Sequence, residues 1–469
     1  MSGYQYHKVT EELIEKLKAT LGGKYVATDP EKLEVYKTDE EGNPHYHHMP
    51  EVVVFPGTAE EISQVMKLAN EYLVPVTPRG AGTGLACGAI PIYGGIVLVM
   101  DRFDKIIELN AESMYAIVQA GVRTIDLQNA AKEKGLLYAG DPCSSDSCQI
   151  GGNVATNAGG NRVVKYGTTR DQVYAVQVVT PTGDIVELGA RTEKNSTGYC
   201  LEKIFVGSEG TLGIITQITL RLVPLPTCRI DFLAVFDEVE QALHLPLRVL
   251  ASGLKPASME FMSNAAIRQI ARYLKTELPH QDKGSYIIIT LDALNEDELD
   301  YKTEKLDALC EECGAADVLA ADEDRIWKAR RNHAEATRSD SLVYYAEDIV
   351  VPIDKVLEIM KYLPGLQEKY GISATTVAHI GDGNIHVNAM KGTLSEEEWE
   401  TRLAGFHEDL YSLVYRLGGR LSGEHGIGYK KVHEMEEFTD PHVLNIMRAF
   451  KKSIDPNYIL NPGKIFSIQ

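Results

Sequence analysis

The chain lacks long apolar runs. In 469 residues there is no stretch of about 18 uncharged apolar residues, so we predict no membrane-spanning helix. The opening MSGYQYHKVTEELIEKL also lacks the apolar core of a secretory signal. Cysteine is scarce, and seven cysteines, an odd number, predict reduced thiols in a cytoplasmic compartment.

Basic residues are in deficit as well. Lys and Arg total 47 against 67 Asp and Glu, which gives a formal net charge of −20 at pH 7. This balance argues against nucleic acid or anionic lipid as the main partner. An anionic substrate therefore needs a local positive group, such as a metal ion or an arginine.

The pattern of apolar residues predicts an α+β protein with more than one domain. Residues 52–55 form a predicted buried strand, and residues 58–72 a helix with Thr58 as N-cap and Glu61 at the capping-box position. After strand-rich residues 172–223, a second alternating region begins. The length also suits two or three packed units. The expected segments are a helical lead at 1–49, a domain at 50–225, a second domain at 226–415 and a C-terminal segment at 416–469.

Glycine, in contrast, is concentrated in loops. PRGAGTGLACGA at 78–89 can turn successive backbone N–H groups toward one anion, although a plain surface loop explains it equally well. No Gly-Lys-Ser/Thr follows, which argues against a P-loop, and a strand rather than a helix comes next, which argues against a Rossmann turn. Two further loops, at 143–171 and 207–213, have a similar composition. Together the three loops favour a long dinucleotide ligand that is held by neither a P-loop nor a Rossmann turn.

These loops resemble those of the flavin-binding family that contains vanillyl-alcohol oxidase, D-lactate dehydrogenase and the catalytic subunit of glycolate oxidase. The resemblance runs from about residue 50 to the C-terminus. It implies FAD, with the pyrophosphate held by Pro78, Arg79, Gly80, Ala81, Gly82, Thr83 and Gly84. It places Pro142, Gly151, Gly152, Asn157 and Gly160 near the flavin and ribityl chain, and Gly210 and Ile215 beside the adenosine. Residues 78–225 contain no histidine, so we expect non-covalent FAD.

The resemblance also implies an architecture. Residues 50–225 would form a two-part FAD-binding domain of the p-cresol methylhydroxylase type. Residues 226–415 would form a ferredoxin-like α+β cap domain for the substrate, and the C-terminal segment would return to the FAD domain.

The stretch TTVAHIGDGNIHVNAM, at 375–390, predicts a β-hairpin with Asp382-Gly383 as a two-residue turn. That register sets His379 opposite His386, and it directs both histidines and Asn388 to one face. Such a pair can bind a metal ion, whereas a surface hairpin with two ordinary histidines is the alternative. A third ligand is available in SGEHGIG at 422–428, which is otherwise a glycine-bounded turn.

The same family carries a paired signature of this kind in its D-2-hydroxyacid dehydrogenase branch. By that resemblance His379, His386 and Glu424 are metal ligands, His425 is the catalytic base and Asn388 contacts substrate. Two histidines and a carboxylate suit one Zn²⁺, Fe²⁺ or Mn²⁺ ion, and the sequence does not choose among them.

RIWKARRNH, at 325–333, puts Arg330 and Arg331 on a predicted helix. The simplest interpretation is two arginines exposed to solvent. Relatives, however, use an arginine in this helix to bind the substrate carboxylate, and Arg330 matches that arginine by its spacing from Trp327. Relatives that oxidise 2-hydroxyglutarate add a lysine on the next strand. LVYYAEDIVV has none, which favours lactate or glycolate.

The sequence thus predicts a 2-hydroxy acid dehydrogenase that forms the 2-keto acid and passes electrons to a partner, because the CxxC at 310–313 is isolated. The family offers iron–sulfur subunits or an electron-transferring flavoprotein as that partner. Alternatives are a direct oxidase that produces peroxide, a D-2-hydroxyglutarate dehydrogenase, a metallohydrolase that uses the histidine site, and a nucleotide-binding regulator that uses the glycine loops.

Overall fold

A computed structural model describes residues 5–468 of the chain. The backbone forms two compact units. Within the described range, unit 1 comprises residues 5–158, 168–224 and 425–468, and unit 2 comprises residues 159–167 and 225–424. Both units mix helices with sheets, as the sequence predicts.

Unit 1 begins with a four-stranded sheet in the order β1-β2-β4-β3. Strands β2, β4 and β3 are parallel, and β1 joins β2 in antiparallel pairing. The predicted cap of α3 is confirmed, because the Thr58 side chain accepts a hydrogen bond from the Glu61 N–H. The elements of this part are α1 (Glu11–Leu21), β1 (Val26–Ala27), α2 (Pro30–Leu33), β2 (Val52–Val54), α3 (Ala59–Tyr72), β3 (Val76–Arg79) and β4 (Ile96–Val99).

The second sheet of unit 1 has five antiparallel strands in the order β5-β6-β10-β8-β9. Strands β7 and β11 form a separate short ribbon. The elements are β5 (Ile106–Asn110), β6 (Tyr115–Gln119), α4 (Thr124–Glu133), β7 (Leu136–Leu137), α5 (Ile150–Thr156), α7 (Thr169–Gln172), β8 (Val173–Val179), β9 (Ile185–Gly189), α8 (Leu201–Phe205), β10 (Ile214–Arg221) and β11 (Val223–Pro224).

The C-terminal segment returns to unit 1. It carries α16 (Val432–Phe438) and α17 (Pro441–Ile454). Beyond α17, Leu460 makes a parallel bridge to Val76 of β3, and the Asn461 N–H donates to the Val76 carbonyl at 2.7 Å. The end of the chain therefore extends the first sheet next to the strand that leads into the first glycine loop.

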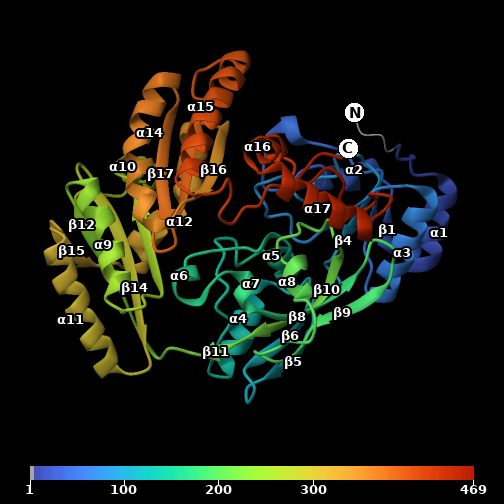
Figure 1. Cartoon of the computed structure of the whole chain (residues 1–469), viewed down its shortest axis with the longest axis horizontal. Coiled ribbons are helices and arrows are strands. Elements are labelled where there is room, and N and C mark those ends of the chain that lie inside the picture. The colour runs from blue at the N-terminus through green and yellow to red at the C-terminus, as the bar shows by residue number, and fades with distance from the viewer. Residues whose placement is uncertain (1–4, 469) are drawn as a thin grey trace. The chain divides into compact units, whose positions relative to one another are not determined.

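Unit 2 is built on one seven-stranded antiparallel sheet in the order β15-β12-β14-β13-β17-β18-β16 (Figure 1). The elements are α6 (Val163–Tyr166), β12 (Cys228–Phe236), α9 (Val239–Ala251), β13 (Ser258–Met262), α10 (Asn264–Leu274), β14 (Ser285–Ala293), α11 (Glu296–Glu312), β15 (Asp317–Ala320), a π-helical turn (Glu323–Trp327), α12 (Lys328–Arg331), α13 (His333–Asp340), β16 (Tyr344–Val350), α14 (Val356–Tyr370), β17 (Ser373–His379), β18 (Asn384–Met390) and α15 (Glu396–Arg416).

Helices cover both faces of the unit 2 sheet. On one face α10, the π-helical turn, α12 and α13 enclose an apolar cluster that includes Ile267, Trp327 and Val377. On the other face α9 and α11 contact β12 and β14, and α14 packs between α9 and α15. Because side chains alternate along a strand, the residues two positions from Val377 share the first face.

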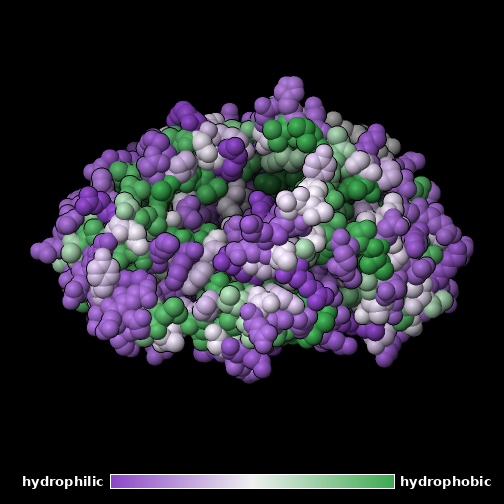
Figure 2. All heavy atoms as spheres, turned by 60° about the horizontal axis from the view of Figure 1, so that its bottom comes forward, coloured by the Kyte–Doolittle hydropathy of each residue, from purple (hydrophilic) through white to green (hydrophobic). Residues whose placement is uncertain are grey.

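Hydrophilic residues dominate the face of the molecule in Figure 2, with apolar residues scattered among them. Within residues 5–468, no helix has both the length and the apolar composition needed to cross a bilayer.

Candidate functional site

The two histidines of the predicted hairpin lie on neighbouring strands of unit 2. His379 pairs with Asn384, and His386 pairs with Val377. The connection therefore spans residues 380–383, and the prediction of a two-residue turn is wrong. Pairing of the first strand ends at His379, so the turn contains four residues instead of the predicted two.

The physical reason lies in the turn itself. The Asp382 N–H donates to the His379 carbonyl at 3.2 Å, and the Asp382 side chain accepts from the Asn384 N–H at 3.1 Å. A shift of two residues keeps every side chain on its original face. The two imidazoles consequently still share one face, with ring centroids 5.2 Å apart.

Glu424 lies against both histidines. Its Oε1 is 3.4 Å from His379 Nε2 and 3.3 Å from His386 Nε2. The edge of a tetrahedron of ligands around an ion with bonds of about 2.1 Å is roughly 3.4 Å long. The Glu424 oxygen thus lies at ligand spacing from each of the two imidazole nitrogens, as it would if the three side chains shared one metal ion.

Glu260, on β13, is a member of the site that the sequence did not reveal. It pairs across the sheet with His379, and its Oε1 lies 2.8 Å from His379 Nδ1. Its Oε2 accepts from Arg330 Nε at 2.9 Å and lies 2.7 Å from Arg330 Nη2. The Glu260 side chain has no solvent exposure. SMEFM, which contains it, looks like an ordinary core strand.

Asp348, on β16, is a second unpredicted member. It pairs across the sheet with His386, and its Oδ1 is 3.8 Å from His386 Nδ1. Its Oδ2 accepts from the Ser422 hydroxyl at 2.6 Å and from the Glu424 N–H at 3.0 Å. The Asn384 amide donates to Oδ1 at 2.8 Å. One buried carboxylate therefore orders the turn that presents Glu424.

Buried charge favours a cation at this position. Arg330 pairs with Glu260, and two more carboxylates lie close to the histidines: Asp348 is fully buried and Glu424 is only 12% exposed. Ligand atoms of Asp348, His386 and Glu424 lie within 4.8 Å of one another. Burying carboxylates is costly unless positive charge lies nearby, and a divalent cation beside Asp348 and Glu424 would add such charge.

The surroundings of His379 also favour a bound cation. Burial by itself lowers the pKa of His379, but Glu260 and Glu424 together raise that pKa well above its usual value. The His379 Nε2 atom is nevertheless buried without a hydrogen-bond partner among residues 5–468. The two carboxylates therefore favour positive charge at this ring, which a metal ion bound to Nε2 would supply.

The two predicted substrate contacts already have protein partners. Arg330 uses its Nε and Nη2 edge for Glu260. The Asn388 amide donates to Thr337 Oγ1 at 3.0 Å and lies 3.4 Å from His333 Nδ1. Both residues are in unit 2, and both are almost fully buried.

His425, the predicted base, begins the last segment of unit 1 and is joined to Glu424 by a peptide bond. The residues that follow His425 are anchored by the buried Glu209, which accepts from the Ile427 N–H at 2.8 Å and from the Gly428 N–H at 2.6 Å. Burial raises the pKa of Glu209, while these two amides lower it. The GSEGTLG loop was identified in the sequence, but not this anchor for the histidine loop.

In unit 1, the first glycine loop presents unused donors. No backbone N–H from Gly80 to Gly84 donates to an acceptor within residues 5–468. The Arg79 guanidinium turns back and donates to the Thr38 carbonyl at 2.6 Å. Five successive free amides fit an anionic group, while Arg79 shapes the loop.

The three glycine loops meet in unit 1. A Cβ on Gly80 would lie 3.2 Å from Gln149 of the second loop, and one on Gly210 of the third loop would lie 2.8 Å from Pro78. The Asn461 amide donates to the carbonyls of Gly88 and Glu209 at 3.0 and 2.8 Å. The sequence alone did not show this convergence, which suits one extended ligand.

The other predicted cofactor residues are spread over both units. Gly151 packs against Ala120, and Asn157 ends α5 in the left-handed conformation with φ 53°. Ile215 lies on β10. In unit 1, Pro142 lies before α5 and Gly152 lies in the first turn of that helix. Gly160 lies in the short segment assigned to unit 2.

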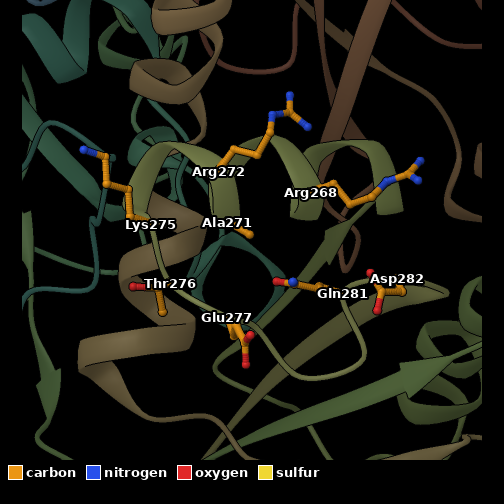
Figure 3. Close-up of a pocket in the computed structure, with 8 residues that line it drawn as sticks. All are labelled: Arg268, Ala271, Arg272, Lys275, Thr276, Glu277, Gln281 and Asp282. Atoms are coloured by element: carbon orange, nitrogen blue, oxygen red, sulfur yellow. The ribbon is translucent and has the colours of Figure 1, made fainter.

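A hollow of about 420 Å³ next to α10 has different chemistry. It is lined by Arg268, Ala271, Arg272, Lys275, Thr276, Glu277, Gln281 and Asp282. Figure 3 shows its three basic side chains pointing in different directions. It has no histidine, and its basic groups do not converge, so the cluster around His379 is the better candidate for catalysis.

Comparison with known proteins finds matches over both parts of the chain. Residues 226–465 match the C-terminal domain of FAD linked oxidases, and residues 50–189 match an FAD binding domain. The chain is 38% identical to a D-lactate dehydrogenase of Anaerostipes hadrus, over 99% of both chains. It is 36% identical to the glycolate oxidase subunit GlcD of Bacillus subtilis (strain 168), over 92% of both.

Among solved structures, p-cresol methylhydroxylase with substrate bound superimposes with a TM-score of 0.80. The alignment covers 99% of this chain and 98% of that one at 18% identity. At such low identity the match concerns the fold alone.

Proposed function

Because the chain belongs to the family of FAD-linked oxidases, we propose that it is an FAD- and metal-dependent 2-hydroxy acid dehydrogenase. Lactate or glycolate is the substrate and the 2-keto acid the product. The observation that carries the proposal is the buried set His379, His386 and Glu424, in which the Glu424 oxygen lies at ligand spacing from both imidazoles and Asp348 lies close by.

The oxidation removes a proton from the hydroxyl group and a hydride from Cα. FAD, bound non-covalently, supplies the hydride acceptor. His379, His386 and Glu424 would hold the divalent ion, which as a Lewis acid lowers the pKa of a bound hydroxyl.

The other roles fall to side chains of this chain. His425 accepts the hydroxyl proton on its imidazole nitrogen. Arg330 binds the substrate carboxylate with the guanidinium edge that Glu260 does not occupy, and Asn388 contacts the substrate beside it. Fixing the carboxylate and the hydroxyl together lowers the entropic cost of reaching the reactive geometry.

Strand β16 supports a small monocarboxylate. Between Tyr344 and Val350 it contains acidic and apolar residues but no lysine for a second carboxylate. D-2-Hydroxyglutarate is therefore the less favoured alternative. The names of the two relatives, D-lactate dehydrogenase and glycolate oxidase subunit, also favour small 2-hydroxy acids.

We further propose that a partner protein, an electron-transferring flavoprotein or an iron–sulfur subunit, takes the electrons from the flavin. Cys310 lies in the helix α11 with its thiol free, and Cys313 follows at the helix end, so this pair makes no redox site by itself. A cytoplasmic location remains part of the proposal. Direct reaction with oxygen is the alternative, and peroxide formation at the rate of substrate turnover would favour it.

The test is anaerobic. The purified protein is mixed separately with D-lactate, L-lactate, glycolate and D-2-hydroxyglutarate while the flavin band near ~450 nm is followed. Bleaching by lactate or glycolate is the expected result. Bleaching by D-2-hydroxyglutarate alone would overturn the substrate assignment, and a flavin band that none of the four acids bleaches would overturn the reaction. Absence of the band after FAD is added would overturn the cofactor assignment and leave the metallohydrolase alternative.

A further inference from the structure

Glu260 contacts both a predicted metal ligand and the predicted carboxylate-binding arginine. Its two oxygens divide between them, with Oε1 2.8 Å from His379 Nδ1 and Oε2 2.7 Å from Arg330 Nη2. The register of β13 against β17 fixes this arrangement, because Glu260 and His379 are directly paired.

This contact decides which nitrogen of His379 faces the metal position. An ionised carboxylate only accepts hydrogen bonds, so a proton must lie on Nδ1 of His379. In a neutral imidazole the lone pair is then on Nε2, the nitrogen 3.4 Å from Glu424. Glu260 thereby sets both the tautomer and the rotation of the ring.

Arg330 makes a fully buried carboxylate tolerable at this place. The side chains of Arg330 and Glu260 are 8% and 0% exposed, and the guanidinium supplies the compensating charge. The same ion pair holds the Arg330 Nε and Nη2 edge in place, so the rest of its guanidinium has a defined direction. The chain of contacts thus runs from His379 through Glu260 to Arg330.

We propose that Glu260 is a positioning residue for catalysis, whose carboxylate orients His379 toward the metal and Arg330 toward the substrate carboxylate. This inference rests on the proposed metal site.

The test compares two buried glutamates of the same sheet. In Glu260→Gln the carboxylate behind His379 is lost. Glu347→Gln is the matched control, because Glu347 is also fully buried and lies 2.7 Å from His407 Nε2, but its carboxylate faces α15, where it pairs with His407 and accepts from the Tyr411 hydroxyl. Both variants and the wild type are dialysed against a series of chelator-buffered Zn²⁺ concentrations, and bound metal per chain is measured by mass spectrometry.

Glu260→Gln should bind Zn²⁺ about ten- to a hundredfold more weakly than the wild type, with Glu347→Gln unchanged. Co²⁺-loaded Glu260→Gln should also show altered d–d absorption bands, since His379 is no longer fixed. Equal Zn²⁺ affinity of Glu260→Gln and the wild type would overturn the inference. Equal weakening in Glu347→Gln would overturn it too, since the effect would then be general. A wild type that binds no divalent ion would instead overturn the metal site itself.

Glu260→Asp covers the case in which the glutamine variant does not fold. Aspartate keeps the charge that Arg330 needs, but its shorter side chain draws the oxygens away from His379. Weaker Zn²⁺ binding with an unchanged flavin spectrum supports the positioning role. Wild-type Zn²⁺ affinity in a folded Glu260→Asp would overturn it.

Discussion

Buried carboxylates determine the chemistry of individual residues in unit 2. Glu260 and Asp348 are fully buried, and each pairs across the sheet with one of the two histidines. The sequence indicated the histidines because their spacing around a glycine turn is distinctive. It gave no sign of Glu260 or Asp348, because a single acidic residue inside a strand is informative only when the neighbouring strand is known.

A substitution of His425 tests its proposed role as the acceptor of the hydroxyl proton. We expect His425→Asn to keep FAD and metal but to slow flavin reduction by at least about a hundredfold, since general bases contribute that much or more. Anaerobic stopped-flow absorbance measures the rate. His433→Asn, at an exposed position of α16, is the control and should reduce its flavin normally. A near wild-type rate in His425→Asn would remove the residue from this role.

His333 should make the stability of the protein depend on pH. Burial, with Arg330 and His386 nearby, lowers the pKa of His333 to about 3. The unfolded chain takes up this proton near pH 6.5, so the stability contribution is complete above that pH and is lost as the pH falls toward 3.

Between pH 7 and pH 5 the wild type should therefore lose about 2 kcal/mol more unfolding free energy than His333→Asn loses. Denaturant unfolding at the two pH values measures both. The same pH dependence in the two proteins would show that His333 is not the group responsible.

At the scale of the element, the glycine loops and the hairpin depend on turn geometry. The sequence predicted correctly that a strand follows the first glycine loop and that both histidines share a face. It misplaced the turn at 380–383, because side-chain and backbone bonds of Asp382 close a longer connection than the Asp-Gly pair suggests. Local sequence signals specify that a turn exists more reliably than where it closes.

Two glycines of one loop give a matched test of FAD binding. Gly82 has φ +72°, and a Cβ there would lie 2.2 Å from the Arg79 guanidinium, whereas a Cβ on Gly88 would meet nothing within 4 Å. Gly82→Ala should weaken FAD binding by at least about tenfold through backbone strain, and Gly88→Ala should leave it unchanged. Titration of apoprotein with FAD, followed by flavin fluorescence, measures both. Equal affinities would argue against this loop as part of the FAD site.

At the scale of the whole molecule, the predicted cofactor sites divide between the two units. The three glycine loops meet in unit 1, although residues 159–167 of the second loop belong to unit 2, and His379, His386 and Glu424 lie in unit 2. We therefore expect FAD and metal to be separable. Each unit has its own sheets and its own core.

Chelation tests that separation. Dialysis against EDTA should remove the metal and lower flavin reduction by substrate at least about tenfold, while the FAD spectrum remains. Adding back Zn²⁺, Mn²⁺ or Fe²⁺ in turn should restore the rate and identify the ion. Acid precipitation should then release the flavin into the supernatant if the FAD is non-covalent, as we propose. Full activity after complete metal removal would contradict the proposed mechanism.

The sequence by itself determined the α+β class and the three glycine loops, because these depend on local periodicity and composition, and it led to the prediction of His379, His386 and Glu424 as ligands through a resemblance to a family signature. Only the tertiary structure decided that the loops meet and that the turn of the hairpin spans residues 380–383. It also showed that Glu260, Asp348 and Glu209 make hydrogen bonds to the predicted site residues or to the loop that carries them. These contacts join segments far apart in the chain. Strand register and burial create them, and neither is encoded in any short stretch of sequence.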